Sequence, residues 1–251
     1  MRGNGLLIVN ADDWGHDEAT TDAIAGCHES GALTSTTAMM FMEGSEHAAR
    51  RAAELPSLGV GLHLNLDEEY SDPAVPPTVR ERQRRLVDHY RDARRRRWLY
   101  DPRNRQATNR IVADQFKRFH ELYGRAPTHL DGHHHAHLAA NVLLSPAVPR
   151  GTKIRNTLTD TGRRSPLTRG LQVARDRLLL GRRRTTEFFF DLRAIWPGLG
   201  GAGTGDALGL ASRSSVEIMV HPGLRDELDA LRSTEWAAAL EGLPLGTFAA
   251  L

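Results

Sequence analysis

The residues most able to do chemistry are concentrated in one short segment. Five of the twelve histidines lie between His129 and His137, and the carboxylate of Asp131 lies among them. Imidazole is the commonest metal ligand in proteins, and it titrates near neutral pH. A cluster this dense, in the middle of the chain and interrupted by an acid, predicts a metal or catalytic site.

Three further segments place reactive side chains at the ends of predicted strands. The acidic pair Asp12-Asp13 follows the first apolar run, His63 lies near the end of the third, and His221 follows the last. Because the C-terminal ends of parallel strands meet on one face of an α/β fold, we expect these groups to gather beside the histidine cluster. One carboxylate and two imidazoles can hold a divalent ion and leave positions for water and substrate.

The two adjacent aspartates need a turn in the chain if both are to reach one site. Successive residues of a strand point to opposite faces, and Trp14-Gly15 predicts a turn directly after Asp13. One carboxylate would then bind the metal while its neighbour, Asp12, acts as a base. The charge of the ion would offset the repulsion between them.

The residues alone do not decide which histidines of the cluster bind the ion. In an extended segment, His133, His135 and His137 would share one face. In a helix, His133 and His137 would do so. We expect the other members, including His129 and Asp131, to orient the ligands.

The elements that carry these side chains alternate between strand and helix. Strands are predicted at residues 6–12, 33–40, 58–66, 128–130, 153–155, 185–190, 216–223 and 245–248. Helices are predicted at 17–30, 45–55, 80–97, 111–123, 170–180 and 233–240, and glycine-rich 196–209 is predicted to be a loop. The alternation indicates an α/β fold with a parallel sheet, open or closed into a barrel, and we expect one domain spanning residues 1–251.

Composition excludes several classes of protein. The chain has 251 residues, of which 40% are hydrophobic and 25% charged, as in ordinary globular proteins. No apolar run approaches the roughly 20 residues of a membrane span, and residues 6–9 are too short for a signal peptide, so we expect a cytoplasmic protein without a membrane partner. Cys27 is the only cysteine, which excludes an intrachain disulfide and a cysteine-based zinc site.

Residues 8–15, 61–65, 128–137 and 217–223 together resemble the motifs of the YdjC/ChbG-like carbohydrate deacetylases. The resemblance covers nearly the whole chain. It implies a distorted (β/α) barrel related to the polysaccharide deacetylases and one divalent metal ion, magnesium or zinc. It also implies hydrolysis of the N-acetyl group of a small acetylated amino sugar, such as a chitooligosaccharide, by a homodimer.

The resemblance assigns roles that the residues left open. It implies Asp13, His63 and His133 as metal ligands, Asp12 as the catalytic base and His221 as the candidate acid. We expect a supporting or substrate-binding set around them, formed by Trp14, Asn65, His129, Asp131, His135, His137 and Arg155.

The chain departs from the family pattern mainly in residues 67–110 and 194–214. Asp67-Glu68-Glu69 stands where the family usually has a glycine-containing loop, and Gly132 stands where serine is common. These departures affect the expected substrate more than the expected metal site.

Two other functions compete with deacetylation. Another single-metal hydrolase, an esterase or a phosphoesterase, would use the same ligands. A non-catalytic metal- or nucleic-acid-binding protein would use the arginine-rich segment 80–97, which we interpret as a solvated helix because the net charge is only +2. That function leaves Asp12 and His221 without a role, so we do not expect nucleic acid as a partner.

Overall fold

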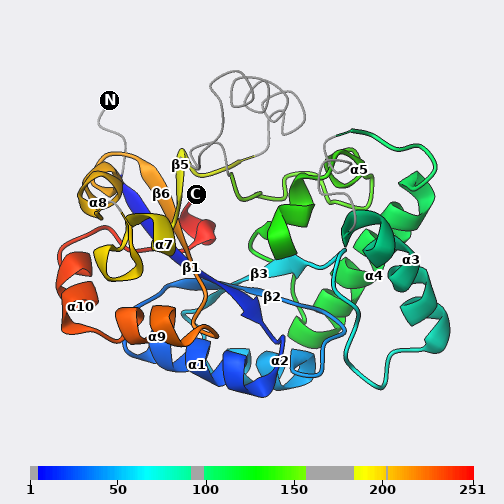
Figure 1. Cartoon of the computed structure of the whole chain (residues 1–251), viewed down its shortest axis with the longest axis horizontal. Coiled ribbons are helices and arrows are strands. Elements are labelled where there is room, and N and C mark those ends of the chain that lie inside the picture. The colour runs from blue at the N-terminus through cyan, green and yellow to red at the C-terminus, as the bar shows by residue number, and fades with distance from the viewer. Residues whose placement is uncertain (1–4, 92–98, 157–183, 202) are drawn as a thin grey trace.

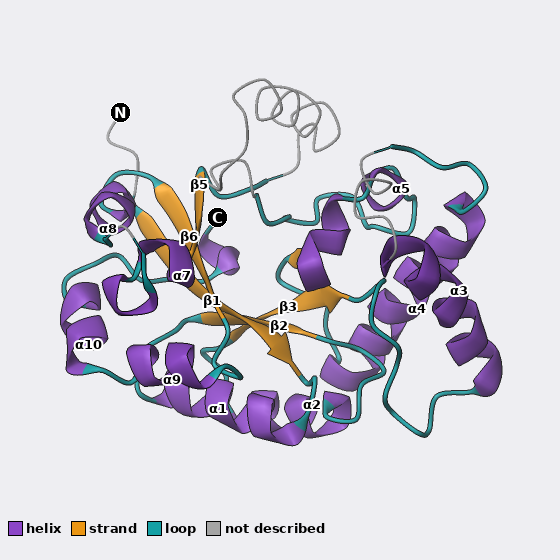
Figure 2. Ribbon diagram, viewed as in Figure 1, coloured by secondary structure: helices purple, strands orange, loops and turns teal. Residues whose placement is uncertain are grey.

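The computed structural model of the chain describes residues 5–91, 99–156, 184–201 and 203–251. Six parallel strands form a sheet in the order β4-β3-β2-β1-β6-β5, which curls into half of a barrel (Figure 2). The strands are β1 (Leu6–Trp14), β2 (Ser35–Ala38), β3 (Gly59–Leu64), β4 (Leu130–Gly132), β5 (Phe188–Asp191) and β6 (Ser215–Val220). The predicted α/β fold of distorted-barrel type is confirmed.

Helices cover the outside of the sheet, with α1, α2 and α9 along one side and α3 against α4 beyond β3 (Figure 1). The α-helices are α1 (Glu18–Glu29), α2 (Ser45–Glu54), α3 (Pro77–Arg91), α4 (Arg105–Tyr123), α5 (Ala140–Leu143), α7 (Leu192–Ile195), α8 (Gly205–Ala211), α9 (Arg225–Leu231) and α10 (Thr234–Leu240). The 3-10 segments are η2 (His133–Leu138), η3 (Pro197–Leu199) and η4 (Phe248–Ala250). None of the described helices is long and apolar enough to cross a membrane.

Some sequence predictions differ from these elements. The predicted helix 80–97 corresponds to α3, and its residues 92–97 lie outside the described residues. The predicted loop 196–209 contains η3 and the start of α8, and the predicted strand 245–248 is a single bridge from Leu245 to Leu7 followed by η4. Short helices form here because neighbouring packing outweighs the weak local preference of glycine-rich sequence. The predicted helix 170–180 lies outside the described residues.

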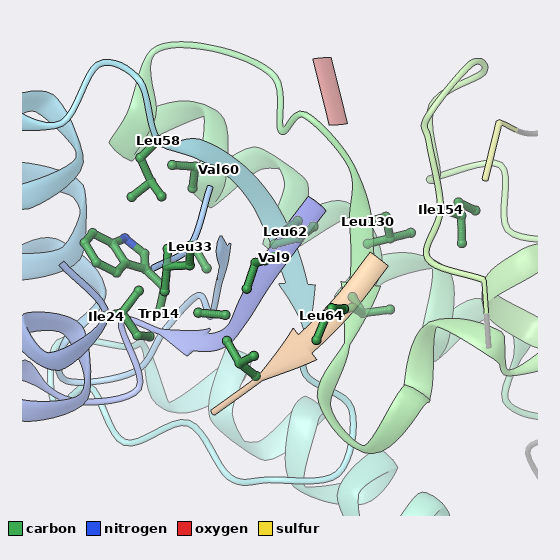
Figure 3. Packing of buried hydrophobic residues seen from close by; sticks show 14 of the residues in the cluster. Val9, Trp14, Ile24, Leu33, Leu58, Val60, Leu62, Leu64, Leu130 and Ile154 are labelled. Atoms are coloured by element: carbon green, nitrogen blue, oxygen red, sulfur yellow. The ribbon is translucent and has the colours of Figure 1, made fainter. Parts of the chain in front are cut away.

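The central strands are buried because helices and loops cover both of their faces. Every residue of β3 and β6 is buried, as parallel sheets require. Trp14 ends β1 and is fully buried with Ile24, Leu33 and Leu58 in the core (Figure 3). Its indole therefore anchors the end of β1 beneath the adjacent acidic pair.

The predicted strand 153–155 is reduced to a single bridge beside β4. Ile154 forms a parallel bridge with Leu130, and the backbone N–H of Arg155 donates to the Leu130 carbonyl at 3.0 Å. The pairing carries Arg155 into the interior of the half-barrel, although it is 143 residues from Asp12 in the sequence.

The end of the half-barrel where the strands begin is filled by η4. The ring of Phe248 is fully buried against Leu6 and Ile8 of β1. It also stacks on His129, which precedes β4, with 3.6 Å between ring centroids. These contacts close the end where the strands begin, so the face where the strands end remains for chemistry.

Candidate metal centre

A cavity of about 380 Å³ lies where β1, β3, β4 and β6 end. Its lining is formed by Asp12, Asp13, His63, Gly132, His133, His134, His135, Met219 and His221. The four chemical signals found at predicted strand ends are therefore together in one place.

Asp13, His63 and His133 form the centre of this cavity. The Oδ1 atom of Asp13 lies 3.3 Å from Nε2 of His63 and 3.2 Å from Nδ1 of His133. One candidate ligand atom from each of the three residues lies within 4.8 Å of the other two. A carboxylate and two imidazoles converging in this way fit a single divalent ion with open coordination positions.

The turn that brings both aspartates to the cavity lies at Asp13 itself. Asp13 has a left-handed backbone with φ 69°, and the pairing of β1 with β2 shifts register between Ala11 and Trp14. The sequence placed this turn one residue later, at Trp14-Gly15. A bulge of this kind reorients one side chain without ending the strand, so β1 continues to Trp14.

His63 is fixed by a buried carboxylate on its other nitrogen. Its Nδ1 atom lies 2.8 Å from Oδ1 of Asp131 and 3.1 Å from the hydroxyl of Thr37. Donation from Nδ1–H to Asp131 directs Nε2 toward Asp13. Burial alone would lower the pKa of His63, but the charges of Asp131 and Asp12 outweigh it and hold that pKa well above its usual value.

Arg155 joins three buried carboxylates behind the cavity. Its guanidinium donates to both oxygens of Asp12, at 2.7 and 2.6 Å, and to Glu217 at 2.7 Å, and it pairs with Asp131 at 2.8 Å. Burial would raise the pKa of Asp12, but the Arg155 charge outweighs it and holds that pKa well below its usual range. Asp12 therefore stays ionised and oriented. Burial also raises the pKa of Glu217 to about 7.

His221 faces Asp12 and is supported from behind by α9. Its Nε2 atom lies 4.0 Å from Oδ2 of Asp12, and its Nδ1 lies 3.5 Å from Oε1 of the fully buried Glu227. Arg193 donates to the same Glu227 oxygen at 2.7 Å. Burial would lower the pKa of His221, but Glu227 and Asp12 raise it to about 9. His221 is thus an imidazolium at neutral pH.

The histidine cluster is neither an extended segment nor a regular helix. His134 and His135 both adopt left-handed backbones, with φ of 47° and 59°. His133 joins the ligand trio and His135 lines the cavity, while His137 is buried with its ring centroid 6.1 Å from that of His135. Left-handed non-glycine residues store on the order of 1–3 kcal/mol each and cluster at functional sites.

Six of the predicted site residues do not line the cavity: Trp14, Asn65, His129, Asp131, His137 and Arg155. Trp14 is in the core, and His129 stacks on Phe248 at the other end of the half-barrel. Asn65 is fully buried and its amide donates to the backbone carbonyl of Glu68, so it shapes the loop after β3. Arg155 contacts Asp12 rather than the cavity.

Sequence reasoning assigned no role to several residues that support the site. These are Thr37, Glu68, Arg193, Glu217 and Glu227. Glu217 carried a signal, because a glutamate within an otherwise apolar strand must find a buried partner. Glu68, Arg193 and Glu227 lie in a loop and in helices, where acidic and basic residues are ordinary, and a threonine such as Thr37 is ordinary in a strand.

Comparisons with known proteins show the family of the chain, which belongs to the YdjC-like proteins. The family model described as YdjC-like protein matches residues 6–242. A chitooligosaccharide deacetylase of Enterobacter sp. (strain 638) is 30% identical over 271 residues, covering 97% of this chain and 98% of that relative. A chitooligosaccharide deacetylase of Proteus mirabilis (strain HI4320) is 38% identical over 138 residues, and the match spans 50% of its length.

Among solved structures, a protein of Enterococcus faecalis V583 has a similar fold. It is described as a candidate cellobiose-phosphate cleavage protein. The TM-score is 0.69 at 23% identity, with 99% of each chain covered. The likeness extends over the whole fold.

Proposed function

Because the chain belongs to the family of YdjC-like proteins, we propose that it is a metal-dependent carbohydrate deacetylase that hydrolyses the N-acetyl group of an acetylated amino sugar. The observation that carries the proposal is the convergence of Asp13, His63 and His133 beside Asp12 and His221 in one cavity. Relatives named chitooligosaccharide deacetylases support the substrate class.

Asp13, His63 and His133 would hold one divalent ion. Two of the three donors are imidazole nitrogens, which suit zinc better than magnesium, an ion that prefers oxygen ligands. When bound, the ion supplies Lewis-acid chemistry: it polarises the acetyl carbonyl and lowers the pKa of water from about 15.7 to roughly 7 for zinc.

Asp12 would take the proton of the attacking water. The Arg155 guanidinium holds both carboxylate oxygens, which keeps the base ionised and fixes its orientation in the cavity. Water then adds to the acetyl carbon as its proton passes to Asp12.

His221 would protonate the leaving amine. It is an imidazolium at neutral pH and lies on the same side of the cavity as Asp12. Proton transfer to the sugar nitrogen lets the C–N bond break, and the products are acetate and the free amino sugar.

The size of the cavity supports a small reacting group. Its 380 Å³ is near the lower end of the roughly 300–1,000 Å³ typical of small-molecule sites. A single N-acetylated sugar residue at the reaction centre fits this size.

An acetate-release screen tests the proposal. N-acetylglucosamine and its oligomers would be incubated with chelator-stripped protein before and after zinc or magnesium is restored, with aryl esters and phosphomonoesters as comparators. We expect acetate release only with metal, and none from Asp12→Asn although that variant retains zinc. Turnover of the esters or phosphates alone, or full activity of Asp12→Asn, would contradict the proposal.

A further inference from the structure

Glu68 lies against the candidate ligand His133, on the side away from the other two ligands. The Nδ1 atom of His133 faces Oδ1 of Asp13 at 3.2 Å, whereas its Nε2 atom faces Oε2 of Glu68 at 3.3 Å. Both ring nitrogens therefore have a defined partner. One is directed toward the metal centre, and the other toward a carboxylate from the loop after β3.

The backbone of Glu68 is anchored on both sides. Its carbonyl accepts hydrogen bonds from the side-chain amides of Asn65 and Gln83, and its N–H donates to Oδ1 of Asn65 at 3.0 Å. Asn65 and Gln83 are both fully buried, the second on α3. The position of the Glu68 side chain is thus built into the fold.

The second carboxylate oxygen of Glu68 is directed to the turn between β1 and α1. Oε1 lies 3.0 Å from Nε2 of His16, whose Nδ1 lies 2.8 Å from Oδ2 of Asp17. Asp17 in turn accepts from the backbone N–H of Thr20 at the start of α1. This contact holds one oxygen of Glu68 away from the centre, which leaves Oε2 for His133.

The other imidazole ligand shows the same arrangement. His63 directs Nε2 toward Asp13 and has the carboxylate of Asp131 on Nδ1. A carboxylate on the second nitrogen fixes the tautomer and orientation of a metal-binding histidine and raises its affinity for the ion.

We propose that Glu68 is a positioning residue for the metal ligand His133, holding its ring so that Nδ1 faces the ion. The inference rests on the proposed metal centre and goes beyond it, because the loop that supplies Glu68 is where this chain departs from its family pattern. It assigns the acidic segment 67–69 a part in building the centre.

Zinc affinity measures this role directly. Zn²⁺ would be titrated into metal-free protein in competition with a chromophoric chelator, for wild type, Glu68→Ala and Glu68→Gln. Loss of such a supporting carboxylate typically weakens metal binding about 10- to 100-fold, and we expect that for Glu68→Ala. Glu68→Gln keeps an acceptor oxygen of the same reach, so its affinity should lie between that of the alanine variant and wild type.

Glu69→Gln is the matched control, because it removes the same charge one residue further on. Glu69 is exposed and pairs with Arg84 rather than with the centre, so its zinc affinity should stay within about two-fold of wild type. The absorption spectrum of the Co²⁺-loaded protein gives a second readout, and we expect it to change for Glu68→Ala and not for the control.

The outcomes separate this inference from the proposed function. Zinc binding that depends on Asp13 but is unchanged in Glu68→Ala would overturn the role of Glu68 alone. Unchanged zinc affinity with a raised KM would also overturn it, because Glu68 would then act on the substrate. Zinc binding that survives Asp13→Ala would overturn the metal centre itself.

Discussion

The two candidate imidazole ligands, His63 and His133, are each supported by a carboxylate, but from different parts of the molecule. His63 and Asp131 are neighbours in the register of β3 and β4, and their side chains are 1% and 0% exposed. His133 begins η2 and Glu68 lies on the loop after β3, and their side chains are 18% and 33% exposed. The first pair is fixed by the sheet, whereas the second depends on how η2 and the loop after β3 fold over it.

Under the proposed function, the difference means that the buried support of the candidate centre can be kept while its exposed support varies. Changing the buried pair disturbs Arg155 and the whole network of carboxylates behind Asp12. Changing the exposed pair disturbs one ligand and one loop. Stability and metal affinity should therefore be coupled at Asp131 and separable at Glu68.

The largest effect is expected from Asp131→Ala. It removes the acceptor of His63 and one of three carboxylates around Arg155, and breaking a buried ion pair typically costs about 3–5 kcal/mol. Urea unfolding of the metal-free protein should show a loss of that order, together with weaker zinc binding. Glu68→Ala is the contrast, with a stability loss below roughly 1 kcal/mol because its ion pairs are half-exposed. Equal losses in the two variants would remove the distinction between the pairs.

The sequence predicts the positions of Asp13 and His63 better than those of His133 and Glu68. Strand ends can be recognised from apolar runs, so Asp13 and His63 could be brought together by the parallel topology alone. The orientation of His133 could not be predicted, because it depends on two consecutive left-handed residues that local propensity disfavours. Glu68 could not be assigned either, because an acid in a loop gives no pattern and its position depends on tertiary contacts with Gln83 and His16.

The sequence predicts Arg155 as a supporting or substrate-binding residue, but it does not predict which groups the guanidinium contacts. Residues 153–155 predict a short strand that includes Arg155, but the pairing of Ile154 with Leu130 decides which carboxylates Arg155 reaches. Long-range pairing of this kind depends on tertiary packing and not on local sequence. Trp14 illustrates the opposite case, in which a residue next to Asp13 in the chain lies in the core.

Phe248→Ala tests whether a loss of stability far from the candidate ligands also weakens zinc binding. The ring is fully buried at the far end of the half-barrel, and removing a buried phenylalanine typically costs about 3–5 kcal/mol. Because Phe248 contacts His129 and not the ligands, we expect the unfolding free energy to fall by about 3 kcal/mol while zinc affinity stays within two-fold. A parallel loss of zinc binding would show that the two ends of the half-barrel are coupled.

His221 combines features of both regions, because it lines the cavity but is anchored by the buried Glu227. Its pKa is raised from 6.5 to about 9, so its protonated form is stabilised. The contribution of His221 to the free energy of unfolding is complete below pH 6.5 and is lost as the pH rises through about 9. If His221 is the acid, kcat/KM for acetate release should decline above about pH 9.

Glu227→Gln should move this basic limb toward pH 6.5. The substitution removes the charge of Glu227, whose contact with His221 raises the pKa of the imidazole, while Asp12 and Asp13 still face the ring. The matched control is Asp226→Asn, which removes an exposed carboxylate that pairs with Arg193 and does not contact His221. A basic limb that is identical in wild type and Glu227→Gln would exclude His221 as its source.

The smallest effect on stability is expected from His134→Gly, which changes the backbone next to His133, the more exposed of the two candidate imidazole ligands. Glycine removes about 1–2 kcal/mol of left-handed strain, but it loses roughly 0.5–1 kcal/mol through unfolded-state entropy and up to about 1 kcal/mol through the ion pair with Asp67. Urea unfolding should therefore change by less than about 1 kcal/mol, and zinc affinity should fall several-fold because the adjacent His133 is less constrained. His134→Asn, which tolerates the same backbone, should retain wild-type zinc binding. A stability loss above about 2 kcal/mol in the glycine variant would mean that the loop is held by side-chain contacts as firmly as β3 and β4 hold His63, and the contrast between the two ligands would then fail.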